Sequence, residues 1–239
     1  MLADRVRMGG NSKDKDDLSG SPGSPYLIAG TMEEGFFGEV SSSELITGNT
    51  LASECGISEG TSQFSTEPWL KFAYKGEIQF VAKKPIRHSI SWDAINTANC
   101  VYGGKTVQIG GYTYRVRLMK GALTEPSKHE DADRGAHGSE WNRLMLPIHI
   151  QAKDKSWDYP AYVENDIPYW GIDYTDVDLL THGNYGNGSY SWCQETAESA
   201  TSRRVGRGNG GVSLSAVFSA SNTSSIRGWR PVLRLVEED

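Results

Sequence analysis

The chain has little cysteine, no long apolar run and no cluster of positive charge. Its cysteines, Cys55, Cys100 and Cys193, are widely spaced and form no CxxC motif, which predicts buried free thiols in a protein folded in a reducing cytoplasm. No apolar stretch approaches the ~20 residues of a membrane helix, and the first residues contain no signal-peptide core. We therefore expect neither membrane insertion nor secretion by the usual route.

The charge pattern and the motifs exclude several function classes. A net charge of −6 without a run of Lys or Arg argues against nucleic-acid binding. The sequence contains no GxSxG motif, no P-loop and no Ser–His–Asp order. Its 5 histidines are scattered and never spaced as a zinc pair on one helix. We expect no enzymatic activity, no cofactor and no metal.

The composition predicts one main domain with an appendage. A chain of 239 residues with 37% hydrophobic residues can build a core, and its 27 glycines indicate many turns. Residues 1–25 are polar and cannot fold alone, so they form either a disordered leader or an attachment arm that orders against another subunit. The contact residues expected of such an arm are Leu2, Val6, Arg7 and Met8.

Residues 26–68 and 69–239 show different patterns. The first range contains short strand-like runs and short helix signals, which predict a small connecting subdomain. The second range begins with a hairpin about Lys75-Gly76 and continues with another about Gly110-Gly111. Ser91 and Ser139 begin helix-like segments, as N-cap residues do. Strands and helices together predict an α+β fold.

The C-terminal fifth of the chain predicts a recognition surface. Strands around Val205 and from Trp229 to Leu235 bracket the Ser- and Asn-rich segment Val212–Arg227. A stiff base that displays small polar residues and aromatics is typical of adaptable binding surfaces. The alternative is an exposed loop that binds nothing, with the aromatics in the core. The expected ligand-binding residues are Trp170, Tyr185, Asn209, Ser213, Ser215, Phe218 and Asn222.

Four segments carry a resemblance to a known family: R-V-x-R-G at 204–208, GWRPVL at 228–233, SWDAIN at 91–96 and GSEWNRLMLPIH at 138–149. Their order resembles C-type-lectin-fold proteins, in the branch of formylglycine-generating-enzyme-like domains and phage tropism-determinant or tail-tip proteins. The resemblance implies a C-type-lectin-like fold over residues 69–239.

The same resemblance implies a function and partners. It implies a non-enzymatic phage virion protein, folded in the host cytoplasm, with a lectin-like head that binds a host-surface glycan or protein. The arm would dock onto tail or capsid proteins, and a homotrimer would suit a fibre-like assembly. The alternative is a purely structural decoration or collar subunit that contacts only other virion proteins.

Three groups of residues test that resemblance. The enzymes of the family oxidise their substrates with copper and two nearby cysteines, whereas this chain offers Cys193 alone in that region. The aspartates Asp173, Asp176 and Asp178 are spaced as calcium ligands can be, but the glycine and the closing glutamate of a helix–loop–helix site are missing. Trp141-Asn142 is followed by Arg143 where a sugar-binding lectin has an aspartate. Calcium-dependent sugar binding is therefore not expected.

The arginines near the C-terminus have two interpretations. The segment 199–236 holds six arginines and no acid, whereas the segment 151–180 is rich in Asp and Glu. We expect the two segments to pack together, with Arg207 and Arg230 in structural ion pairs. The alternative is an anion site for phosphorylated or acidic sugars.

Overall fold

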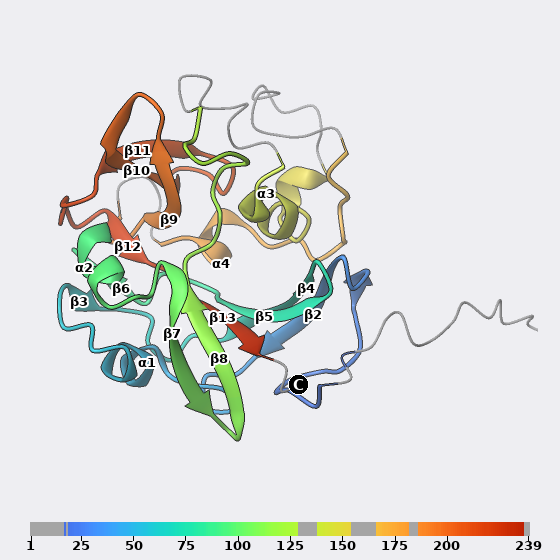
Figure 1. The fold of residues 1–239 in the computed structure, drawn as a ribbon. Coiled ribbons are helices and arrows are strands. Elements are labelled where there is room, and N and C mark those ends of the chain that lie inside the picture. The colour runs from blue at the N-terminus through green and yellow to red at the C-terminus, as the bar shows by residue number, and fades with distance from the viewer. Residues whose placement is uncertain (1–16, 18, 129–137, 154–165, 182–185, 237–239) are drawn as a thin grey trace, which may run out of the picture.

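The computed structural model describes residues 17, 19–128, 138–153, 166–181 and 186–236, which form two sheets and several short helices (Figure 1). Within these residues one sheet has seven strands. From edge to edge they are β1 (Ala29–Gly30), β2 (Glu34–Val40), β4 (Trp69–Tyr74), β5 (Glu77–Ala82), β13 (Val232–Val236), β8 (Tyr112–Arg117) and β7 (Tyr102–Ile109). All neighbouring pairs are antiparallel.

The other sheet has six strands among the described residues. In order they are β11 (Ser215–Ser219), β10 (Ala200–Gly208), β9 (Tyr190–Ala197), β12 (Arg227–Trp229), β6 (Arg87–His88) and β3 (Thr61–Ser62). Only β9 and β12 run parallel in this sheet. The helical segments are α1 (Gly48–Glu54), α2 (Trp92–Thr97), α3 (Glu140–Met145), the 3₁₀ turn Ile150–Ala152 and α4 (Asp176–Leu179).

The expectation of an α+β fold is wrong, because the fold is mainly β. Strands account for 38% of the described residues and helices for 13%, and the four α-helices among them are all short. The helix signals after Ser91 and Ser139 are real but each lasts six residues. Fewer than two helical turns at each site add little helical structure to a chain built on two sheets.

The local signals of the sequence are confirmed. The hairpin about Lys75-Gly76 joins β4 to β5, and the hairpin about Gly110-Gly111 joins β7 to β8. The hydroxyl of Ser91 accepts a hydrogen bond from Ala94 N, and that of Ser139 accepts one from Asn142 N. Side-chain caps of this kind satisfy backbone donors that the first helical turn leaves free.

The seven-stranded sheet is covered by apolar side chains on both faces. Along β4, Trp69 and Ala73 belong to one core cluster, whereas Leu70 and Phe72 belong to the other. Alternate residues of a strand point to opposite faces, so β4 lies between the two clusters. Helices α1 and α2 contribute to the first cluster and α3 and α4 to the second (Figure 1). Residues 26–68 are part of this core, since β2 pairs with β4.

The predicted strand from Trp229 to Leu235 is two strands in different sheets. Strand β12 pairs with β6 and β9, whereas β13 pairs with β5 and β8. The chain crosses between the sheets at Arg230-Pro231, where Ala82 N donates to the Pro231 carbonyl. Proline cannot donate to a ladder, so it suits this interruption.

A buried lysine binds the N-terminal segment to the core, and we call its ion pair with Asp17 the Lys71–Asp17 clamp. The Lys71 ammonium lies 2.7 Å from Asp17 Oδ2, with both side chains almost fully buried, and it donates to the carbonyls of Pro22 and Ser24. Asp17 in turn accepts from the hydroxyls of Ser19 and Ser21. Residues 17 and 19–25, assigned to the arm from sequence, are therefore attached to the body. The arm residues Leu2, Val6, Arg7 and Met8 lie outside the described residues.

Replacing Asp17 by Asn should destabilise the fold strongly. The change leaves the Lys71 ammonium buried without its counter-charge, which costs about 3 kcal/mol when a buried pair is broken from one side. Urea unfolding at pH 7 measures the loss. Glu77→Gln is the matched control, because its pair with Arg234 is half exposed and should contribute less than about 1 kcal/mol. Equal small losses for both variants would contradict a structural role for the clamp.

The clamp also predicts a loss of stability in acid. Burial alone would raise the pKa of Asp17, but the Lys71 ammonium and the Ser19 and Ser21 hydroxyls outweigh it and lower the pKa. The contribution of Asp17 to stability is then fully present above its pKa in the unfolded chain, about 3.9. This contribution is lost as the pH falls through the lower pKa of the folded state. Unfolding free energies measured from neutral pH into this acid range should fall more steeply for the wild type than for Asp17→Asn.

Candidate functional site

A short polar ribbon lies exposed beside the edge of the six-stranded sheet. Ser221, Thr223, Ser224 and Ser225 are exposed, and Asn222 is half-buried; we call residues 221–225 the ribbon. It follows β11, which is an edge strand and pairs only with β10. The exposed part is shorter than the expected segment Val212–Arg227, whose first residues are buried.

Both ends of the ribbon are fixed by backbone hydrogen bonds. Before it, Ala220 N donates to the Ser202 carbonyl, and the Ala220 carbonyl accepts from Asp93 N. At its other end, Gly188 N donates to the Ser225 carbonyl. Inside the ribbon, Asn222 Oδ1 accepts from Ser224 N at 2.8 Å, which is a local side-chain turn. The ribbon is thus a polar surface with anchored ends.

A cation–aromatic stack flanks the ribbon. The Arg227 guanidinium lies over the Phe218 ring at 3.3 Å and over the Tyr190 ring at 5.2 Å, and the two rings are 4.7 Å apart. Burial lowers the pKa of Arg227 to about 10, and its Nε and Nη1 atoms make no hydrogen bond to any described residue. A Cβ on Gly206 would come within 3.0 Å of Phe218, so glycine there lets the ring lie close to β10.

The structure brings some of the expected ligand-binding residues together and separates others. Ser215 and Phe218 lie half-buried on β11, and Asn222 belongs to the ribbon. Asn209 is buried, with its Oδ1 accepting from the Ser189 hydroxyl, and Ser213 is buried with its carbonyl on Arg207. Trp170 packs against the second core cluster, and Tyr185 lies outside the described residues.

Sequence reasoning missed the role of Arg227 in this surface. Arg227 and Tyr190 are opposite each other because β12 and β9 pair in parallel. They are 37 positions apart in sequence, so no local pattern links them. Only the pairing of these two strands could have revealed the contact.

Arg207 and Arg230 lie buried over the same indole. Their guanidinium groups lie 5.6 and 5.1 Å from the centre of the Trp141 ring. In the described part of the chain, Arg207 donates to the Gly121, Ser213 and Leu214 carbonyls and to Asn142 Oδ1. These acceptors are carbonyl and amide oxygens, whereas we expected carboxylates.

Arg230 makes fewer polar contacts than Arg207. It donates to the Leu179 carbonyl, and within the described ranges its Nε and Nη1 atoms make no hydrogen bond. Burial lowers its pKa to about 9. No carboxylate of the described residues forms an ion pair with it, so the expected ion pair is not what holds it.

The Cys193 thiol lies in the same buried region. It is fully buried, and burial raises its pKa, so the reactive thiolate is disfavoured there. All three cysteines are free and buried. A Cβ on Gly121 would come within 2.6 Å of the Cys193 sulfur, which shows how closely the backbone packs against it.

The three aspartates considered for calcium point to different partners. Asp173 accepts from the Tyr169 hydroxyl, Asp176 from Val212 N, and Asp178 from Thr175 at the start of α4. Across the described ranges, no group of three or more His, Cys, Asp or Glu residues is arranged to hold a metal ion. No helix in those ranges has both the length and the apolar character needed to cross a membrane.

Replacing the buried Glu195 by Gln should stabilise the protein at high pH. Burial raises the pKa of Glu195 to about 7 in the folded protein. The wild type therefore loses stability as the pH rises from the pKa of Glu195 in the unfolded chain through about 7. The Gln variant has no such loss, and its advantage at pH 8 should approach about 3 kcal/mol. Urea unfolding at pH 4.5 and pH 8 measures it, with exposed Glu198→Gln as the control. An advantage equal at both pH values would contradict the raised pKa.

Comparison with known protein families, curated proteins and solved structures finds no match for this chain. The resemblance to phage virion proteins, carried by GWRPVL and its companion segments, therefore stays a prediction.

Proposed function

We propose that this chain is a non-enzymatic phage virion protein whose ribbon binds a component of the host surface. The observation that carries the proposal is the exposed run of Ser, Asn and Thr at residues 221–225, fixed at both ends. Anchored ends reduce the entropy lost when a loop binds. Small hydroxyl and amide side chains provide adaptable hydrogen bonding.

The stack beside the ribbon suggests the chemistry of the ligand. Phe218 and Tyr190 provide aromatic surface, and Arg227 lies across both rings. Aromatic faces with nearby hydroxyl and amide groups suit a sugar ring or a polar peptide, because each presents both apolar and hydrogen-bonding atoms. A host-surface glycan or protein is therefore the proposed ligand.

The N-terminal segment supplies the proposed attachment. The Lys71–Asp17 clamp fixes the point from which residues 1–16 continue. We assign the contact with a tail or capsid protein to Leu2, Val6, Arg7 and Met8, and the proposed location is the virion, where a homotrimer would form a fibre-like assembly. Clamping the base limits the positions that the head can take relative to its support.

A purely structural subunit is the second candidate. Tyr26 and Ile28 are 66% and 60% exposed next to β1 at the edge of the seven-stranded sheet. Large apolar side chains exposed together suit contact with a neighbouring protein. In that case the chain would contact only other virion proteins, through this edge.

A bulky residue in the ribbon should abolish host binding without unfolding the protein. Thr223→Trp places an indole on the exposed ribbon, and we expect binding of the purified protein to susceptible cells to fall at least tenfold. Gln108→Trp is the matched control, because Gln108 is exposed on β7 in the other sheet. Flow cytometry with labelled protein measures binding, and thermal unfolding checks the fold.

Two results would contradict the proposed function. Undiminished binding by Thr223→Trp would remove the ribbon from the recognition surface. Absence of binding by the wild type, together with loss of particle integrity when residues 1–16 are deleted, would favour the structural subunit instead.

A further inference from the structure

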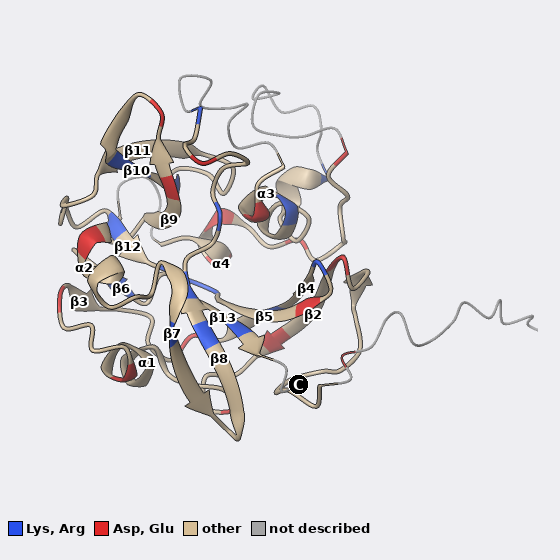
Figure 2. Ribbon diagram, in the orientation of Figure 1, with Lys and Arg blue, Asp and Glu red and all other residues tan. Residues whose placement is uncertain are grey.

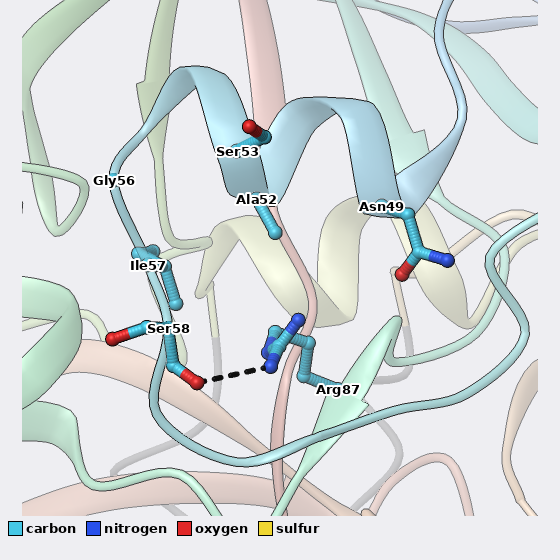
Figure 3. A pocket seen from close by; sticks show the side chains of 7 residues that line it. All are labelled: Asn49, Ala52, Ser53, Gly56, Ile57, Ser58 and Arg87. Atoms are coloured by element: carbon cyan, nitrogen blue, oxygen red, sulfur yellow. Dashed lines mark hydrogen bonds between the residues drawn. The ribbon is translucent and has the colours of Figure 1, made fainter.

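A pocket lies at the other end of the six-stranded sheet, near β6 and β3. Its volume is about 480 Å³, and it lies between α1, the loop that follows it and β6 (Figure 3). The residues that line it are Asn49, Ala52, Ser53, Gly56, Ile57, Ser58 and Arg87. The sheet order places β11 and the ribbon at the opposite edge. The pocket is therefore separate from the proposed recognition surface.

Arg87 is held rigidly in this pocket. Its backbone pairs with Trp229 of β12 on one side and Ser62 of β3 on the other. Its Nε donates to the Glu59 carbonyl at 3.0 Å, and its Nη2 donates to the carbonyls of Ser58 and Gly60 at 3.2 and 2.7 Å. Three fixed hydrogen bonds orient the planar guanidinium, and no hydrogen bond from its two Nη1 donors is found among the described residues.

No acidic side chain in the described part of the chain neutralises the Arg87 guanidinium. Among the described residues, no carboxylate oxygen lies within the 4.0 Å of an ion pair, and burial is the one cause that lowers the pKa of Arg87. Glu59, whose backbone carbonyl accepts from Arg87, uses its carboxylate to accept a hydrogen bond from Ser91 N. A positive group that no carboxylate of the described residues neutralises thus lines a pocket on a chain of net charge −6.

The other lining residues add an apolar wall. Asn49 Oδ1 accepts from the Ser62 hydroxyl, and the Asn49 amide nitrogen points away from Arg87 (Figure 3). Ala52 points toward Arg87 in Figure 3, and Ala52 and Ile57 are both buried. Charge-assisted hydrogen bonds from a fixed guanidinium are among the stronger polar contacts that a protein can offer.

We propose that this pocket binds a small oxyanionic group, a carboxylate, sulfate or phosphate, through Arg87 Nη1. Sugar acids and sulfated or phosphorylated sugars carry such groups. The site would give the protein a second contact, independent of the ribbon, with an acidic surface.

Isothermal titration calorimetry of the full chain with sodium glucuronate, glucose 6-sulfate and inorganic phosphate tests the site at constant ionic strength. Glucose is the neutral control, and comparison of the three anions identifies which oxyanion the pocket takes. We expect saturable binding of at least one anion and none of glucose. Arg87→Met should weaken that binding at least tenfold, because it removes charged hydrogen-bond donors.

Two further variants keep the test decisive. Arg115→Met makes the same charge change at an exposed position in the other sheet and should leave binding unchanged. If Arg87→Met does not fold, Ala52→Met fills the pocket and keeps the guanidinium, and it should weaken binding by a similar factor. Absence of saturable binding by the wild type would overturn the proposal, as would equal binding by the wild type and Ala52→Met. Neither result would bear on Thr223→Trp and the ribbon.

Discussion

The crossing of the chain from one sheet to the other is the constraint on which the rest of the structure depends. Two segments cross side by side: residues 83–86 lead from β5 to β6, and Arg230-Pro231 leads from β12 to β13. Ile86 N donates to the Trp229 carbonyl, and Ala82 N donates to the Pro231 carbonyl. A Cβ on Gly228 would come within 2.8 Å of Pro85, so this close approach requires glycine. The two sheets are therefore joined by a short double crossing, and each sheet positions the other.

Charge is buried on both sides of this crossing, but it is compensated differently. On the seven-stranded sheet, the Lys71 ammonium has Asp17 and backbone carbonyls around it. At the crossing, Arg230 has the Leu179 carbonyl and the face of Trp141. A buried cation without a carboxylate pays a desolvation penalty that aromatic contact offsets only in part, which is why its pKa is lowered. Lys and Arg residues are interspersed with Asp and Glu over both sheets (Figure 2).

Local features of this fold could be predicted from sequence, and distant ones could not. The two hairpins and the Ser91 and Ser139 caps depend on residues within a few positions of one another, and all four are confirmed. The predicted fold class was wrong because the helix signals at Ser91 and Ser139 each correspond to only six helical residues, which is too few to form a helical layer. The split of Trp229–Leu235 depends on which strands flank it, and the burial of Lys71 depends on a segment about 50 positions away. In the candidate site, the composition of the sequence predicts the ribbon. The contact of Arg227 with Tyr190 beside it could not be predicted, because it depends on the pairing of β9 with β12.

The six-stranded sheet holds the ribbon and the Arg87 pocket near its two edges. Edge positions suit recognition, because strands in the middle of a sheet have both neighbours occupied, and their side chains here form the core. Strand β12 contributes to both regions. Its Arg227 side chain lies over the Phe218 ring beside the ribbon, and the Trp229 backbone pairs with that of Arg87. Two residues of one short strand thus fix the relative placement of the two regions. A ligand that reached both would gain affinity from that fixed spacing, because the second contact would form without further ordering of the protein.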